Sequence, residues 1–164
     1  MTLINPELHI IDKTYENEDV FSNIVTYAFR LNNNQTLPIF CYGIWPPTYK
    51  NIIDQLQYIR TSNPTKIDKA VWQLILSFPD KHISDQKFRL ADMIAKTFAS
   101  EYQIFYSCHT DTKHLHFHFF VSTTSFLINN TPLIKEKMDS YIKLIQDMTK
   151  DYGIDLIINW KVGE

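Results

Sequence analysis

The sequence contains few glycines and cysteines, the residues of flexible linkers and disulfide cross-links, and it has no long apolar run. It contains three glycines and two cysteines in 164 residues. Cys41 and Cys108 lack the spacing of a CxxC pair, which favours buried thiols over a disulfide, as in a cytoplasmic protein. No apolar run approaches the roughly 20 residues that span a bilayer, and the first residues lack a basic region followed by an apolar one. We therefore expect a soluble, cytoplasmic protein with no membrane partner.

A surplus of positive charge is also absent. Sixteen Lys and Arg stand against 18 Asp and Glu, which gives a net charge of −2 and a pI near 6.3. Proteins that grip a nucleic-acid backbone usually carry a basic surplus, because each phosphate contact uses a cation. The composition argues against broad, non-specific binding to duplex DNA, but it leaves room for a local basic patch.

The length and the 45% hydrophobic content predict a single domain over residues 1–164. Apolar spacing typical of helices occurs in four stretches, namely Glu18–Leu31, Thr48–Thr61, the residues after Ser84 and Thr131–Tyr152. Strand character occurs in Leu3–Ile11 (expected at a sheet edge), Pro38–Trp45, Ala70–Phe78, Tyr102–His109, His114–Ser122 and Ile154–Val162. This order predicts an α+β fold, a two-layer sandwich in which helices cover a central antiparallel or mixed sheet of about five strands.

The richest motif lies between His109 and Phe119, which hold four of the six histidines. His114, His116 and His118 alternate with apolar residues, and the side chains of a β-strand alternate between its two faces. One face can therefore pack into a core while the other displays a row of imidazoles. A strand that is rich in histidine by chance would fit the pattern, but this density favours a site for metal binding or proton transfer.

The geometry of a hairpin suggests which histidines converge. His116 and His118 lie about 7 Å apart along a strand and point the same way. Thr110–Lys113 is a tight polar turn, so His109 folds back beside them and completes a three-histidine metal site with open coordination positions. Asp111 is placed to accept a hydrogen bond from a ligand imidazole. His114 could be a further ligand, a proton donor or a contact to bound phosphate.

The segment from His109 to His118, followed by an apolar run, resembles the third motif of relaxases. These are the plasmid and conjugative-transposon mobilisation nucleases of the HUH endonuclease superfamily. The resemblance extends upstream to the strand ending at Leu76–Pro79 and the helix after Ser84, and downstream to the helix ending at Asp151–Ile154. It therefore covers most of the chain and implies a single relaxase-like domain.

The resemblance implies a role for several residues. Tyr27 matches the nucleophile that attacks a DNA phosphodiester at an origin of transfer, and Tyr15 is the next candidate. His109, His116 and His118 match the triad that holds a divalent ion, with Mn, Mg, or Zn or Ni in vitro as candidates. The expected partner is single-stranded or hairpin DNA, and an accessory DNA-binding protein is a candidate second partner.

Three alternatives stay open. Tyr27 borders the apolar stripe of its helix and could be an ordinary core aromatic. The run His114–Phe119 also satisfies the pattern of histidine-triad nucleotide hydrolases and transferases, in which a histidine attacks a phosphate without a metal. Finally, Gln73 and Ser122 stand where relaxases often have a histidine and an asparagine, which would suit a catalytically inactive, relaxase-fold DNA-binding module.

Overall fold

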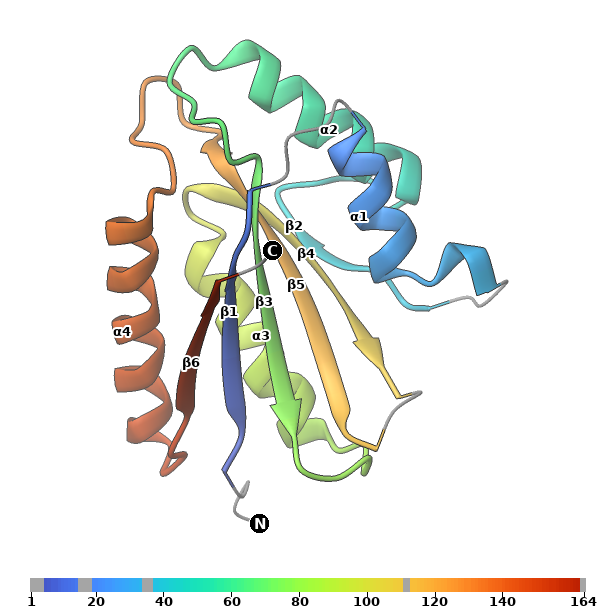
Figure 1. Ribbon diagram of the computed structural model, residues 1–164, viewed down its shortest axis with the longest axis vertical. Helices are drawn as coiled ribbons and strands as arrows, with labels where there is room; N and C mark the ends of the chain where they lie inside the picture. The colour runs from blue at the N-terminus through green and yellow to red at the C-terminus, as the bar shows by residue number, and fades with distance from the viewer. Residues whose placement is uncertain (1–4, 15–18, 34–36, 111–112, 163–164) are drawn as a thin grey trace.

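A sheet of six strands organises the computed structural model, which describes residues 5–14, 19–33, 37–110 and 113–162 (Figure 1). The strands are β1 (Glu7–Asp12), β2 (Phe40–Tyr42), β3 (Val71–Phe78), β4 (Tyr102–His109), β5 (Leu115–Ser125) and β6 (Ile157–Val162). Their order is β2-β4-β5-β3-β1-β6, and every neighbouring pair is antiparallel except β1 and β6. The α+β class and the mixed sheet are confirmed, with six strands where about five were expected.

The place of β1 corrects one expectation. Leu3–Ile11 was predicted to form an edge strand, but β1 lies between β3 and β6. The last strand, β6, pairs in parallel with β1 on the side away from β3, and Glu7 lies opposite Ile157. Leu8 and Ile10 are fully buried as a result. The edges of the sheet are instead β6 and the three-residue β2.

The helices are α1 (Val20–Ala28), α2 (Tyr49–Ser62), α3 (Asp85–Phe98) and α4 (Lys135–Asp151), and a short 3-10 turn, η1, covers Leu31–Asn33. As the sequence suggested, Ser84 caps α3 by accepting from the Lys87 amide at 3.3 Å. Helix α4 begins later than predicted, because the Leu133 amide donates to the Thr123 carbonyl at 2.8 Å and keeps that segment extended. None of the described helices is long and apolar enough to cross a membrane.

Two hydrophobic cores lie on opposite faces of the sheet (Figure 1). Helices α3 and α4 cover one face, where Phe117 and Phe119 of β5 are fully buried. Helices α1 and α2 cover part of the other face, where Phe105 and Phe120 pack against them. Since β5 alternates, His116 and His118 share this second face, and His116 is only partly buried. On this face His118 is buried, and His116 alone of the two keeps part of its surface exposed.

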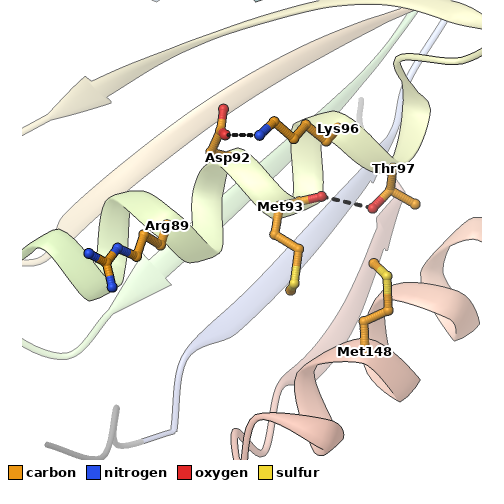
Figure 2. A pocket seen from close by; sticks show the side chains of 6 residues that line it. All are labelled: Arg89, Asp92, Met93, Lys96, Thr97 and Met148. Atoms are coloured by element: carbon orange, nitrogen blue, oxygen red, sulfur yellow. Dashed lines mark hydrogen bonds and ion pairs between the residues drawn. The ribbon is translucent and has the colours of Figure 1, made fainter.

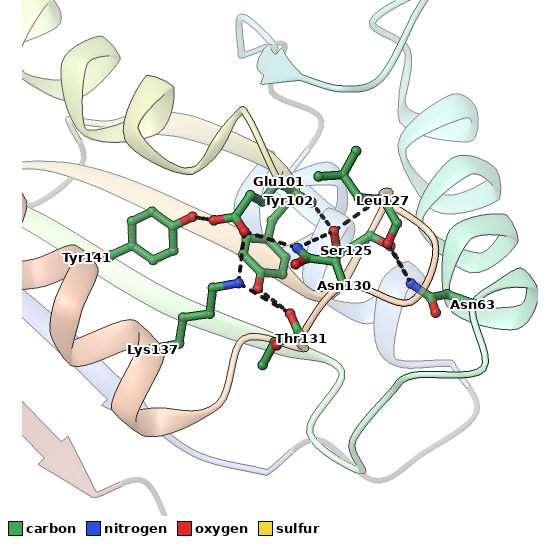
Figure 3. A network of polar contacts seen from close by, with 9 residues as sticks. All are labelled: Asn63, Glu101, Tyr102, Ser125, Leu127, Asn130, Thr131, Lys137 and Tyr141. Carbon is green, nitrogen blue, oxygen red and sulfur yellow. Dashed lines mark hydrogen bonds and ion pairs between the residues drawn. The ribbon is translucent and has the colours of Figure 1, made fainter.

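A polar network fastens the loop between β5 and α4 to the sheet (Figure 3). The Glu101 carboxylate accepts hydrogen bonds from Asn130 at 3.0 Å and Lys137 at 2.9 Å, and a further one from the Tyr141 hydroxyl. Burial of the carboxyl raises its pKa, but its bonds to Lys137 and Asn130 and the Lys137 charge outweigh burial, so the pKa of Glu101 is lowered. The ionised form therefore stabilises the fold.

We expect Glu101→Gln to reduce the free energy of unfolding by about 1.5 to 3 kcal/mol at pH 7, the range for hydrogen bonds to a charged group. A depressed carboxyl pKa contributes stability above the unfolded value of 4.5, and this contribution disappears as the pH falls through the folded pKa. Urea unfolding of both proteins from pH 7 to pH 3 should show the difference shrinking. The exposed Glu136→Gln is the matched control, and a pH-independent difference would contradict the prediction.

Candidate functional site

The β4–β5 hairpin brings the predicted histidines together. His109 on β4 pairs with His116 on β5, and Ser107 pairs with His118. The ring centroids of His109 and His118 are 4.1 Å apart, and those of His116 and His118 are 5.9 Å apart. His114 lies just before β5 rather than on it, and it is exposed with its ring 6.0 Å from His116. Three imidazoles from two strands thus form one cluster.

His118 is a buried, neutral imidazole. It is 5% exposed, and its Nδ1 has no hydrogen-bond partner in the part of the chain that the structure describes. Burial lowers the pKa of His118 to about 2, and the nearby charges of His109, His116 and Arg30 add to this shift. A neutral imidazole keeps a lone pair on one nitrogen, which is the form that can bind a metal ion.

His109 links the hairpin to helix α1. Its Nε2 lies 2.6 Å from the carbonyl oxygen of Ala28 and 3.2 Å from Oγ of Ser107. A carbonyl oxygen can only accept, so Nε2 carries the proton and, in the neutral ring, Nδ1 carries the lone pair. The ring is 2% exposed, so this bond is shielded from water. It holds the last residue of α1 against the histidine cluster.

The imidazoles of the cluster are potential metal ligands, but their rings do not converge on one point. Within residues 5–14, 19–33, 37–110 and 113–162, no set of three or more His, Cys, Asp or Glu side chains is arranged to hold a metal ion. The reason lies partly in His109, whose Nε2 points to the Ala28 carbonyl. The chemistry of the set fits a divalent transition metal, since three imidazoles lie on adjacent strands and the Nδ1 atoms of His109 and His118 are buried without a hydrogen-bond partner among the described residues. Asp111, expected to orient a ligand imidazole, lies outside the described residues.

Tyr27 is not a core aromatic, which settles the rival interpretation of its position on α1. Its side chain is 45% exposed. Its ring centroid lies 5.6 Å from that of His118 and 6.1 Å from that of His109, in edge-on contacts. Tyr15, the alternative nucleophile, lies outside the described residues. The structure therefore places an accessible phenol directly beside the buried imidazoles.

Arg30 also lies at this cluster and was not among the predicted site residues. Its guanidinium carbon is 5.7 Å from the centroid of the Tyr27 ring. The residue follows α1 with a positive φ of 54°, so it lies outside the helical spacing of α1. In the sequence, only its position three residues after Tyr27 could have indicated that Arg30 belongs to the site.

A hollow on the surface lies away from the histidines (Figure 2). It runs between α3 and α4, which cover the opposite face of the sheet. The Asp92–Lys96 ion pair lies on its α3 side, and Met93 extends towards Met148 of α4. The hollow is lined by none of the predicted site residues, so it is separate from the histidine cluster.

The chain matches a protein-family model. The family model described as "Relaxase: MobA/VirD2-like, nuclease domain" matches residues 27–154, more than three quarters of the chain. The match begins at Tyr27 and includes the whole β4–β5 hairpin. No curated protein and no solved structure matches the chain.

The buried bond of His109 generates a stability prediction. We expect His109→Ala to lower the free energy of unfolding by about 1 to 3 kcal/mol, because the Ala28 carbonyl loses its donor in a site that water reaches poorly. The exposed His114→Ala serves as the control and should change it by less than about 0.5 kcal/mol. Chemical denaturation followed by circular dichroism measures both. Equal effects of the two substitutions would show that the bond contributes nothing.

Proposed function

The chain belongs to the relaxase family with a MobA/VirD2-like nuclease domain, and we propose that it cleaves and rejoins one DNA strand at an origin of transfer through Tyr27. The family places the protein among the nucleases that nick DNA in plasmid mobilisation. The observation that supports the finer proposal is the contact of an accessible tyrosine with two buried histidines, at ring distances of 5.6 and 6.1 Å.

In the proposed step, Tyr27 Oη attacks the phosphorus of a phosphodiester. A bond forms between this oxygen and phosphorus, and the bond from phosphorus to one sugar oxygen breaks. The phenol proton leaves through a nearby base, and a proton ends on the departing sugar oxygen, so no oxidant or reductant is needed. Since the phosphodiester is exchanged for a phosphotyrosine ester, the strand stays attached and the reverse reaction can reseal it. His109 beside Tyr27 is the candidate base, and His114 is a candidate proton donor or phosphate contact.

His109, His116 and His118 are the residues that would hold a divalent ion, with Mn or Mg, or Zn or Ni in vitro, as candidates. When bound, the ion would supply positive charge that polarises the scissile phosphate. The chain's own part is to keep His118 neutral by burial, as its lowered pKa indicates, and to fix the three imidazoles on two paired strands. Asp111 would accept a hydrogen bond from one of them.

The proposed substrate is single-stranded or hairpin DNA, since a reactive phosphate has to reach Tyr27 and the histidines at the same time. A net charge of −2 allows few phosphate contacts, so we propose a modest affinity of the chain alone. An accessory DNA-binding protein would supply the missing contacts. The localisation proposed for this reaction is the cytoplasm, where plasmid DNA is found.

A second candidate function is a catalytically inactive DNA-binding module of the same fold. The observation that favours it is the orientation of the histidine rings, which do not converge on one point among the described residues. The histidine-triad hydrolase is a weaker alternative, because that chemistry has no use for an exposed tyrosine beside the histidines. Formation of a covalent protein–DNA adduct separates the first proposal from both.

We expect Tyr27→Phe to abolish the covalent adduct with single-stranded DNA in the presence of Mn²⁺, while the melting temperature stays within a few degrees of the wild type. The substitution removes one half-exposed oxygen and keeps the ring in place against His118. Denaturing electrophoresis detects the adduct, and peptide mapping identifies the tyrosine that carries it. Tyr58→Phe, at an exposed position on α2, is the matched control. Undiminished adduct formation by Tyr27→Phe would assign the nucleophile elsewhere.

We expect His118→Ala and His116→Ala each to remove most binding of Mn²⁺ or Ni²⁺ in a calorimetric titration, because each deletes one of three proposed ligands. The exposed His82→Ala controls for loss of a histidine as such and should bind as the wild type does. An unchanged stoichiometry in both cluster variants would exclude this set of ligands. The metal also distinguishes the reactions, since a chelator should abolish relaxase chemistry and spare a histidine-triad hydrolase.

A further inference from the structure

The residues after helix α1 bring a permanent positive charge to the ring of Tyr27. The guanidinium carbon of Arg30 lies 5.7 Å from the centroid of this ring, and the arginine is partly exposed. An arginine stays protonated at every physiological pH. Unlike the imidazoles, this cation needs neither a proton from solvent nor a bound ion.

The same charge reaches the histidines. The Tyr27 ring that the Arg30 guanidinium approaches lies beside His118 and His109, with ring centroids 5.6 and 6.1 Å apart. A phosphate bound between the phenol and the imidazoles would therefore lie within the field of the guanidinium.

The guanidinium of Arg30 lies near the C-terminal end of helix α1, where it can offset the negative charge of the helix dipole. The helix ends at Ala28, whose carbonyl accepts the bond from His109, so the C-terminal end of the helix faces the cluster. The C-terminal end of a helix carries about half a unit of negative charge, which repels an anion. A guanidinium at this end offsets the repulsion, and its paired N–H groups match two oxygens of one phosphate.

From these observations we propose that Arg30 binds the non-bridging oxygens of the phosphate that Tyr27 attacks. The inference rests on the proposed function, because it needs a DNA phosphate at Tyr27. During the exchange, phosphorus gains the bond to Tyr27 Oη and loses the bond to the sugar oxygen. Arg30 keeps all its protons and stabilises the negative charge on the other two oxygens through hydrogen bonds alone.

Two substitutions that remove the same charge test the proposal. Arg30→Gln should slow adduct formation in single turnovers by about 100- to 1,000-fold, as expected for one lost donor to a transition-state oxyanion. Arg89→Gln, on α3 at the opposite face of the sheet, should stay within about twofold of the wild type, because its charge is remote and screened. Arg30→Lys should be intermediate, since it keeps the charge and loses the paired donors.

A modified substrate identifies the contact itself. Replacing one non-bridging oxygen of the scissile phosphate by a methyl group removes the negative charge that Arg30 would bind. This methylphosphonate should slow the wild type strongly and slow Arg30→Gln little further, because the two changes delete the same interaction. Full additivity of the two effects would overturn the contact.

The backbone provides a control for folding. Arg30 has a φ of 54°, a conformation that glycine adopts more readily than any other residue. Arg30→Gly should therefore melt no lower than Arg30→Gln and still lose activity. Wild-type rates in Arg30→Gln or in Arg30→Gly would overturn the proposal.

The test also separates this inference from the proposed chemistry. If the wild type binds single-stranded DNA without forming an adduct, Tyr27 chemistry fails, but Arg30 can still be judged from affinity. Weaker binding by Arg30→Gln than by Arg89→Gln would then support phosphate binding, and equal affinities would overturn it.

Discussion

One hydrogen bond joins the two halves of the candidate site. His109 Nε2 donates to the Ala28 carbonyl at 2.6 Å, across 81 positions of sequence, and so connects β4 to the last turn of α1. In a site shielded from water such a bond is strengthened, and leaving either partner unmatched costs free energy. Tyr27 precedes Ala28, so the sheet fixes the position of a phenol whose own side chain is nearly half exposed. Without this bond the helix would be held to the cluster mainly by the apolar residues of its other face.

The second constraint is the register of the β4–β5 hairpin. Leu115, Phe117 and Phe119 are completely buried under α3 and α4, which leaves His116 and His118 no choice of face. A slip of one residue would turn the apolar side chains to the accessible face and the histidines into the core. The packing of one face of the sheet therefore specifies the chemistry of the other. This explains how imidazoles can alternate with fully buried apolar side chains along β5.

The parts of this arrangement that depend on local pattern were predictable from the sequence. The alternation of histidines and apolar residues predicted that the histidines share one face. The tight turn predicted that His109 lies beside His116 on the neighbouring strand. The interior position of β1 was not predictable, because it depends on β6, which pairs with it from the far end of the chain. The late start of α4 depends on a bond from Leu133 to Thr123, and Arg30 follows no period. The orientation of the His109 ring was hidden for the same reason, since its partner is the backbone of a distant helix.

An unpaired nitrogen of the cluster affects both the stability of the fold and the ability of the site to bind a ligand. Nδ1 of His118 is buried without a hydrogen-bond partner among the described residues, and a buried polar atom left unpaired costs about 1 to 3 kcal/mol. The fold meets this cost through the apolar packing of Phe117 and Phe119 on the far side of the same strand. Any group that binds to the free nitrogen, a metal ion or a proton donor, removes the penalty and stabilises the folded state by linkage. A strand whose aromatic side chains are fully buried on one face can thus keep an imidazole with an unpaired buried nitrogen on the other.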